Sequence, residues 1–390
     1  MSRYVNMLAD GMEKRGHKVD VWKPKKKFFN LPAPGFLKKW LGYIDQFIIF
    51  PYHIRRRLKA CTPNTLFVFT DQALGPWVPL VKKLPHVIHC HDFLAYRSAS
   101  GEFPENQTGL TGRIYQNHIR NGYSNGRYFI CVSQRTKEDL EHFHLTKPIQ
   151  TTIVYNGLNK VFAPHDVRHA RSVLQQLVKR NLTTGYLLHI GGNVWYKNRC
   201  GVIEIYNAWR SFSQINLPLI MIGEPPSADL KKLHKQSEFK SEIHILTDIN
   251  DDTLRYAYAG ANAFLFPSYA EGFGWPIAEA MAAGCPVITT NEAPMTEVAG
   301  DAGFFIPRKP IDHKDSKAWA HHAAKVVEQV IYLSFNEQNN LREACLANAK
   351  RFDNEKVMNE IEEFYNYIIS YQNDSKKIFA HVRHSWTNKV

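Results

Sequence analysis

The stretch PSYAEGFGWPIAEAMAAGCPVITT, residues 267–290, holds two glutamates eight residues apart on either side of a glycine-rich turn. The run NAFLFPS, which leads into it, has the composition of a buried strand, and IAEAMAA has that of a helix. Proline is favoured at the start of a helix, where Pro276 stands, and Gly284 occupies the place of a left-handed helix stop. We therefore expect a strand, a turn and a helix in that order, with Glu279 in the first helical turn.

The predicted turn has the properties of a phosphate-binding loop. In an open parallel sheet, turns of this kind face the ligand crevice at the carboxyl ends of the strands. Glycines let the backbone approach closely, and free N–H groups with the helix dipole favour an anion. Glu279 would reach the ribose hydroxyls of a nucleotide, and Glu271 would lie beside the group carried on the diphosphate. The alternative is a plain helix-start carboxylate next to a structural glycine turn.

Short apolar runs alternate with amphipathic stretches along all 390 residues. Runs that are apolar throughout indicate strands buried on both faces, as in parallel sheets covered by helices. The length exceeds one compact core, so we predict an α/β fold of two Rossmann-like domains, 1–164 and 165–352, followed by an amphipathic helix and tail over 353–390. The predicted strands are TLFVFT, HVIHCHD, YFICVS and TTIVYN in the first domain, and GYLLHIGG, PLIMIGE, EIHILTD, NAFLFPS, CPVITT and AGFFIP in the second.

Composition excludes several classes of protein. Hydrophobic residues make up 44% and charged residues 22% of the chain. No uninterrupted apolar run reaches the ~18 residues of a membrane-spanning helix. The opening MSRYVNMLADGMEKRGH carries charges where a secretion signal needs an apolar region. The six cysteines are scattered without CxxC spacing, which is typical of a reduced, cytoplasmic protein. We therefore expect a cytoplasmic location.

The net charge of +13 is concentrated near the N-terminus, where residues 1–60 contain 14 Lys or Arg against 4 Asp or Glu. Within residues 23–59, basic clusters alternate with aromatic and aliphatic side chains. Such a surface suits the headgroup region of an anionic membrane, so peripheral contact with the inner membrane face is one interpretation. A partly buried helix with a solvated basic face is the other. Nucleic acid is not expected as a partner, because no nucleic-acid-binding signature accompanies the charge.

Residues 251–306 resemble the sugar-donor half of GT-B-fold glycosyltransferases, specifically the large retaining family 4. The segments TEVAGDAG, IGGNVWYKN, IVYNGLNKVFAP, VIHCHDFLA and ICVSQRTKEDL are similar to further segments of that family. The resemblance implies a GT-B architecture, with two Rossmann-like domains facing a cleft and a C-terminal helix that crosses back to the first domain. The family's Glu–x7–Glu frame, EGFG-P-EA-A-G-PV, is matched by Glu271, Gly272, Phe273, Gly274, Pro276, Glu279, Ala280, Gly284, Pro286 and Val287.

The resemblance also implies roles for individual residues. Glu279 would bind the ribose hydroxyls, and Glu271 would orient the hydroxyls of the sugar ring. Lys197 would neutralise the departing diphosphate. His91 would contact the transferred sugar from the opposite domain, with His89 as its competitor on the same side of the strand. The other implied sugar-donor contacts are Gly191, Gly192, the backbone near Ile249, the amides of Phe273, Gly274 and Trp275, and Arg199, which would replace an arginine that the family commonly carries at the position of Gly191.

No Asp-x-Asp pair occurs in the sequence. Glycosyltransferases that use a divalent cation usually hold it with that pair, so we expect no metal and no other cofactor. The resemblance implies a retaining transfer of a hexose from a nucleotide sugar to a saccharide or lipid-linked saccharide, in cell-surface polysaccharide or glycolipid synthesis. UDP-glucose or a similar UDP-hexose is the expected sugar donor, with GDP-mannose as the alternative. A nucleotide-sugar epimerase or hydrolase, and a non-catalytic nucleotide-sugar sensor, are the alternatives from other classes.

One part of the family pattern is missing at the N-terminus. Family chains open with a strand and a Gly-Gly loop before the segment that VNMLADGMEKRGHKVDVW, residues 5–22, matches. Loss of an inner strand would expose apolar faces and unpaired backbone groups. We therefore expect the true start to lie upstream of Met1, with a differently built first domain as the alternative.

Overall fold

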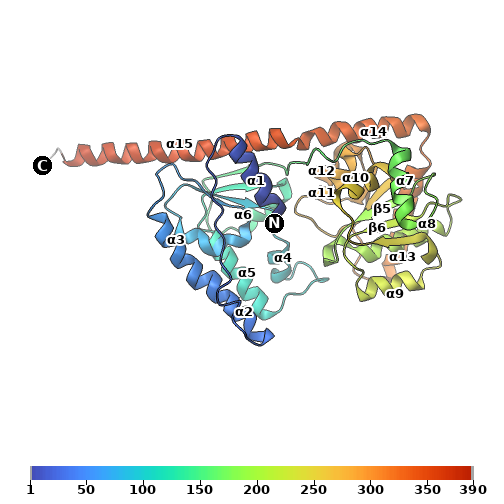
Figure 1. Ribbon diagram of the computed structural model, residues 1–390, viewed down its shortest axis with the longest axis horizontal. Coiled ribbons are helices and arrows are strands. Elements are labelled where there is room, and N and C mark those ends of the chain that lie inside the picture. Colours follow the sequence, from blue (N-terminus) through green and yellow to red (C-terminus); the bar gives the residue numbers. More distant parts are fainter. Residues whose placement is uncertain (1, 388–390) are drawn as a thin grey trace.

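The computed structural model describes the backbone of residues 2–387 and the side chains of residues 4–371 except residue 313. The described chain forms two α/β units, one in blue to cyan and the other in green to orange in Figure 1. The first unit contains a four-stranded sheet in the order β1-β2-β3-β4, and the second a six-stranded sheet in the order β10-β9-β8-β5-β6-β7. All neighbouring strands are parallel. The prediction of two parallel-sheet α/β units is confirmed.

Each of the ten predicted apolar runs corresponds to one strand, although β4 begins one residue before its run, at Gln150. Five of these strands are buried at every residue, which is why they read as continuous apolar sequence rather than as alternation. The strands of the first sheet are β1 (Phe67–Phe69), β2 (His86–Cys90), β3 (Tyr128–Cys131) and β4 (Gln150–Ile153); those of the second are β5 (Leu187–Ile190), β6 (Leu219–Ile222), β7 (Ile243–Leu246), β8 (Ala263–Phe266), β9 (Val287–Thr290) and β10 (Gly303–Ile306).

Helices connect the strands of both units. The first unit contains α1 (Ser2–Lys14), α2 (Gly35–Ile44), the π-helix η1 (Asp45–Ile49), α3 (Phe50–Leu58), the 3-10 helix η2 (Gln72–Leu80), α4 (Leu94–Ser100), α5 (Leu110–Tyr123) and α6 (Gln134–Phe143). The second contains α7 (Val167–Val178), η3 (Trp195–Lys197), α8 (Arg199–Arg210), α9 (Ala228–Gln236), η4 (Lys240–Glu242), α10 (Asp251–Gly260), α11 (Trp275–Ala282), α12 (Met295–Ala299), η5 (Gly300–Ala302), α13 (His313–Ile331), α14 (Phe335–Ala349) and η6 (Lys350–Phe352). The predicted domain boundary at 164–165 lies between β4 and α7.

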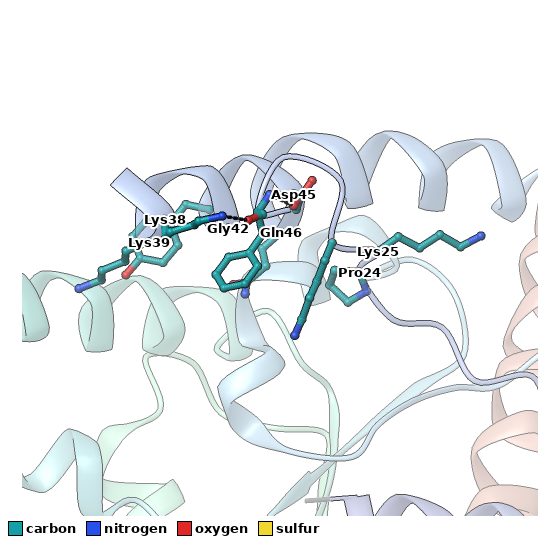
Figure 2. Close-up of a pocket in the computed structure, with 10 residues that line it drawn as sticks. Pro24, Lys25, Lys38, Lys39, Gly42, Asp45 and Gln46 are labelled. Atoms are coloured by element: carbon teal, nitrogen blue, oxygen red, sulfur yellow. Dashed lines mark hydrogen bonds between the residues drawn. The ribbon is translucent and has the colours of Figure 1, made fainter. Parts of the chain in front are cut away.

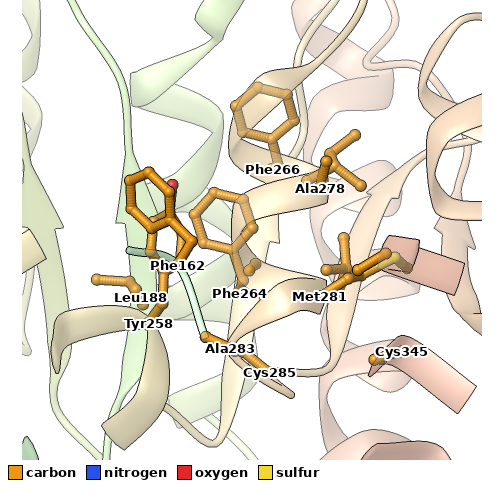
Figure 3. Close-up of a cluster of buried hydrophobic side chains, with 14 of the residues drawn as sticks. Phe162, Leu188, Tyr258, Phe264, Phe266, Ala278, Met281, Ala283, Cys285 and Cys345 are labelled. Atoms are coloured by element: carbon orange, nitrogen blue, oxygen red, sulfur yellow. The ribbon is translucent and has the colours of Figure 1, made fainter. Parts of the chain in front are cut away.

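The core of the second unit holds β8 in place from both sides. On one face, Phe264 and Phe266 of β8 pack with Tyr258 of α10 and Met281 of α11, as Figure 3 shows. On the other face, Leu265 packs in a cluster with residues of α8 and α13. Because both faces of β8 are fixed, the turn that follows it starts from a rigid strand end.

The last helix, α15 (Asn354–Thr387), begins beside the second unit and runs along the first (Figure 1). Its buried residues Val357, Ile361 and Ile368 belong to the same core cluster as Tyr4 and Leu8 of α1. A Cβ atom on Gly11 of α1 would lie 2.6 Å from the sulfur of Met358, so a larger residue at this position would require the Met358 side chain to move. The prediction that the C-terminal helix crosses back onto the first domain is confirmed.

The basic segment forms a helical rod from α2 through η1 to α3. One side packs onto the first unit, where the ring of Tyr43 lies 6.0 Å from that of Tyr115 and the ring of Phe50 lies 4.7 Å from that of Trp77. The opposite side exposes large apolar side chains, described below. Among the described residues, no helix has both the length and the apolar character that a bilayer crossing requires.

The first unit begins with α1, and β1 lies at one edge of the four-stranded sheet. Residues 15–34, between α1 and α2, contain no strand. The expectation of a further strand upstream of Met1 stays a prediction.

Candidate functional site

The order of the second sheet marks where a ligand crevice belongs. The chain builds β5, β6 and β7 in one direction and then returns to place β8 on the other side of β5. At such a switch point the loops after the two central strands diverge, and the gap at their carboxyl ends is the usual ligand site of an open α/β sheet. Here the two loops are 191–198, after β5, and 267–274, after β8.

The loop after β8 has the predicted strand–turn–helix form. Gly274 precedes α11 with φ 105°, and Gly284 follows it with φ 76°, both in the left-handed region that favours glycine. The helix starts at Trp275, one residue earlier than Pro276 suggested. Glu279 is therefore its fifth residue, and the expectation that Glu279 lies in the first helical turn is wrong.

Glu271 and Lys197 bring the two loops together. The Nζ atom of Lys197 donates a hydrogen bond to Oε1 of Glu271 at 2.8 Å. Both side chains are largely buried, with 14% and 8% of their surfaces exposed. The ammonium group also lies 4.7 Å from the ring centre of Phe266, at the end of β8. The structure thus places these two predicted residues in direct contact at the switch point.

Gly272 is a point of close contact between the second unit and the first. A Cβ atom on Gly272 would lie 1.9 Å from the carbonyl oxygen of His91 and 2.7 Å from the Cβ of Asp92. Its carbonyl oxygen accepts hydrogen bonds from Ser133 Oγ at 2.8 Å and Thr136 Oγ1 at 3.1 Å. Only glycine fits between these backbones, and this contact sets the carboxyl end of β2 against the Glu271 turn.

His91 and His89 follow the expected alternation, but their surroundings differ. The Tyr4 ring contacts both, with centroid distances of 4.4 Å to His91 and 5.7 Å to His89. His89 is sealed between the hydroxyls of Tyr4 at 2.6 Å and Tyr365 at 2.7 Å. Burial lowers the pKa of His89 to about 3, so it is neutral and structural. Of the two histidines, only His91 has part of its side chain open to solvent.

The imidazole of His91 is held in one orientation by the backbone. Its Nε2 lies 2.9 Å from the carbonyl oxygen of Thr70, and because a carbonyl can only accept, Nε2 carries the proton. Nδ1 is then an acceptor in the neutral ring. Burial lowers the pKa of His91, whereas the Thr70 carbonyl raises it, and burial prevails. His91 can therefore meet a sugar hydroxyl as a neutral hydrogen-bonding group.

Asp92 belongs to this site, although the sequence analysis did not single it out. Burial raises the pKa of Asp92 to about 6, with the charges of Asp71 and Glu271 acting in the same direction. A carboxyl group that titrates near neutrality in a cleft is a common mark of a functional residue. The available signal was its place directly after β2, where strand ends face a crevice.

Glu279 lies deeper than a simple ribose contact requires. Only 4% of it is exposed, and its Oε2 accepts a hydrogen bond from the hydroxyl of Tyr258 at 3.0 Å. The position on α11, behind Gly274, keeps the carboxylate on the same loop-helix unit as Glu271. Its predicted role toward ribose stays a prediction.

The loop after β5 carries the predicted diphosphate contacts. Arg199 Nη1 donates to Asn193 Oδ1 at 2.6 Å and to the carbonyl oxygen of Glu224 at 2.9 Å. Arg199 is buried and thus holds the shape of the loop that contains Gly191 and Gly192. The carboxylate of Glu224 lies beside this loop, because a Cβ on Gly192 would be 3.2 Å from its Oε1. A bound diphosphate would share the loop with that negative charge.

The remaining predicted residues have the following places. Phe273 is buried and packs against Phe352, with ring centroids 5.4 Å apart, so its side chain belongs to the core and only its backbone faces the turn. Trp275 is half-buried as the first residue of α11. Ile249 is half-buried against the core, directly before the cap of α10, Asn250. Their predicted roles toward the sugar donor stay predictions.

The arrangement can bind an anion next to a polar group. A diphosphate at the switch point would meet the Lys197 ammonium and the amide groups at the start of α11, which stabilise negative charge on a leaving group. The diphosphate would compete with Glu271 for the Lys197 ammonium. The Glu271 carboxylate would then be free to contact the group carried on the diphosphate. Among the described residues, no three His, Cys, Asp or Glu side chains are grouped as metal ligands; the absence of a metal requirement stays a prediction.

Two family models match most of this chain, one in each unit. The model described as Glycosyltransferase Family 4 matches residues 1–161, and that described as Glycosyl transferases group 1 matches residues 174–352. The chain belongs to the family 4, group 1 glycosyltransferases. The site described above falls on both models, since His91 lies within the first match and Lys197, Glu271 and Glu279 within the second.

Two named relatives match parts of this chain. The chain is 36% identical over 130 residues to the O-antigen chain mannosyltransferase B of Escherichia coli, and this matched segment covers 33% of this chain and 34% of that protein. It is 24% identical over 204 residues to the O-antigen chain mannosyltransferase RfbU of Salmonella typhimurium, covering 52% of each. The chain therefore spans no more than about half the length of these two relatives.

Solved structures resemble the whole of this family 4 glycosyltransferase. The sucrose-phosphate synthase of Thermosynechococcus elongatus aligns with a TM-score of 0.69 at 16% identity, covering 94% of this chain and 93% of that one. WaaG, a glycosyltransferase involved in lipopolysaccharide biosynthesis, aligns with a TM-score of 0.61 at 17% identity, covering 90% of each. At such identities the likeness concerns the fold, and it confirms the GT-B architecture that the sequence predicts.

Proposed function

We propose that this chain transfers a hexose from a nucleotide diphosphate sugar to a saccharide or lipid-linked saccharide acceptor. The observation that carries the proposal is the Lys197–Glu271 pair at the switch point of the second sheet, placed by Gly272 against His91 and Asp92 of the first unit. One unit then offers a cation and helix amides to the diphosphate, and the other offers polar groups to the sugar. Family membership supports the same reaction class.

Mannose is the hexose that the relatives favour. Both named relatives are O-antigen chain mannosyltransferases, one of them 36% identical over the matched segment. We therefore place GDP-mannose ahead of UDP-glucose, the sugar donor that the sequence analysis preferred. UDP-hexose stays the second candidate. The named relatives also support a role in cell-surface polysaccharide synthesis.

Calorimetric titration tests the sugar-donor site directly. The protein is titrated in EDTA with GDP, UDP and ADP, and then with GDP-mannose and UDP-glucose. We expect micromolar binding of GDP and GDP-mannose, and its loss in Glu279→Ala. Binding of UDP in place of GDP would reverse the preference between sugar donors. If no nucleotide binds to a folded sample, the proposed function is wrong.

Product analysis separates transfer from the alternatives of other classes. A transferase incubated with sugar donor alone should release free sugar only slowly, and with a suitable acceptor it should form a new glycosidic bond. An epimerase or hydrolase would convert the donor without acceptor, and a sensor would leave it intact. The anomeric configuration of the product, read by NMR, tests retention, and activity in EDTA tests independence of metal.

A further inference from the structure

A cavity of about 370 Å³ lies between the irregular segment before residue 30 and the rod α2–η1. Four lysines line it, Lys25 and Lys26 on the incoming segment and Lys38 and Lys39 on α2 (Figure 2). Its one carboxylate, Asp45, accepts hydrogen bonds from the backbone N–H groups of Phe28 at 3.0 Å and Phe29 at 2.9 Å. The cavity is therefore lined by four lysine side chains and one carboxylate, and the carboxylate already accepts two backbone hydrogen bonds.

Hydrogen bonds fix the cavity before any ligand enters. Lys38 Nζ donates to the carbonyl oxygens of Phe29 at 3.0 Å and Leu31 at 2.7 Å, which ties the irregular segment to α2. The Nζ of Lys26 lies 5.3 Å from the ring centre of Phe29, and that of Lys39 lies 5.8 Å from that of Tyr43. Ring faces thus hold the ammonium groups of two lining lysines, and these groups are the ones that a compact anion such as a phosphate would meet.

The surface around the cavity is apolar as well as basic. Phe36 is 74% exposed and Trp40 65%, one helical turn apart on α2, and Leu31 is 48% exposed beside them. Soluble proteins rarely gather exposed side chains of this size without a partner. Cations flanked by protruding aromatic rings match the boundary of an anionic bilayer, where headgroup phosphates lie just above the acyl chains.

We propose that this cavity binds the phosphate headgroup of an anionic membrane lipid while Phe36 and Trp40 insert among the neighbouring acyl chains. The inference deepens the proposed function, because it places the enzyme where a lipid-linked acceptor would be presented. In Figure 1, α3 lies on the side of the first unit away from the second, and α2 continues along the lower side of the first unit.

Sedimentation with vesicles tests the proposal on the full chain. Vesicles of phosphatidylcholine alone are compared with vesicles that also contain phosphatidylglycerol. We expect binding only to the latter. Lys25→Gln/Lys26→Gln/Lys39→Gln should weaken it on the order of 100-fold, whereas the matched control Lys231→Gln/Lys232→Gln/Lys235→Gln, on exposed α9, should weaken it far less. Trp40→Ala should also weaken binding, and Phe335→Ala, an equally exposed aromatic on α14, should not.

A neutral substitution distinguishes a headgroup site from a diffuse basic patch. Gly42 lines the cavity, and a Cβ there would point at the Phe29 ring 3.4 Å away, so Gly42→Leu fills the space and keeps every lysine. We expect Gly42→Leu to weaken vesicle binding about tenfold while the calorimetric titration with nucleotide is unchanged.

The inference is overturned by unchanged vesicle binding in Gly42→Leu, by equal losses in the two triple-lysine variants, or by no binding to anionic vesicles. It is also overturned if soluble glycerol phosphate binds the cavity as tightly as the vesicles do. Because nucleotide binding is measured separately, each of these outcomes leaves the proposed function standing.

Discussion

Lys197 and Glu271 stabilise each other's charge in a site that is mostly shielded from water. Neither side chain has another ionic partner among the described residues. A buried ion pair contributes little compared with two apolar residues, yet removal of one partner is costly because the other charge remains. The free energy of unfolding should therefore respond strongly to a change at either residue of the pair.

Lys197→Met should lower the free energy of unfolding by about 3–5 kcal/mol, the usual cost of stranding one charge of a buried pair. In Lys197→Met/Glu271→Gln both charges are gone, and we expect most of that loss to be recovered. Urea unfolding of the wild type, the single variant and the double variant measures both quantities. Equal losses in the two variants would mean that the pair is not a coupled unit.

Gly272 offers a second test at a single residue. A methyl group there collides with the His91 carbonyl, so Gly272→Ala must push the two units apart or distort the turn. We expect thermal unfolding to show a loss of about 1–3 kcal/mol and nucleotide-sugar turnover to fall. Gly109→Ala, at a glycine whose added Cβ would meet nothing within 4 Å, is the control and should behave like the wild type.

At the scale of elements, the sequence predicted strands better than contacts. Continuous apolar runs such as HVIHC and AFLF are buried on both faces, so local composition is enough to find them. The turn before α11 could also be predicted from the sequence, because Gly274 and Gly284 mark left-handed backbone. Family resemblance supplied Lys197 and His91.

Contacts between residues that are far apart in the sequence could not be predicted in the same way. The partner of His89, Tyr365, lies 276 positions along the chain, and the partner of Lys197 lies 74 positions away. No local pattern encodes such pairings. Asp92 escaped notice for the same reason, since its raised pKa comes from burial and from Asp71 and Glu271, which only the fold brings near.

His89 lies where α1, β2 and α15 meet, and its burial there predicts that the stability of the protein depends on pH. The pKa of His89 is lowered from 6.5 to about 3, so the unfolded chain takes up a proton between these values that the folded chain refuses. Stability from this group is complete above pH 6.5 and falls as the pH drops toward 3, by up to about 1.4 kcal/mol per pH unit.

Replacing His89 should therefore flatten the acid side of the stability curve. We expect the slope of unfolding free energy against pH, between pH 6 and 4, to be smaller in His89→Gln than in the wild type by about 1 kcal/mol per pH unit. The exposed His53→Gln should leave the slope unchanged. Identical slopes in the wild type and His89→Gln would show that this histidine ionises without unfolding.

At the scale of the whole molecule, polar contacts join the units across the crevice. Arg308 of the second unit pairs with Glu105 of the first at 2.7 Å. The carboxylate of Glu297 accepts hydrogen bonds from the N–H groups of Gln134 and Arg135 at 2.8 and 2.9 Å, at the N-terminus of α6, where a negative charge is favoured. An apolar cluster of Leu94, Phe103 and Ala270 also spans the two units. Relative motion of two units in one chain is the usual expectation unless their interface is large and apolar.

Arg308→Ala should shift the molecule toward an open arrangement. Its neighbour Lys309 pairs at 2.7 Å with Glu204, inside the second unit, so Lys309→Ala is a matched control. We expect a larger radius of gyration by small-angle X-ray scattering, and a higher KM for the sugar donor, in Arg308→Ala only. The same change in both variants would assign the effect to the second unit rather than to closure.

The crossing of α15 has a consequence for how the protein is made. Tyr4 and Leu8 are translated more than 300 residues before Val357, Ile361 and Ile368, which share their core. The sheet of the second unit is complete once β10 has been made, before those residues exist. We therefore expect the second unit to finish folding before the first, the reverse of the usual order during synthesis, because part of the first unit's interior stays open until α15 has been made.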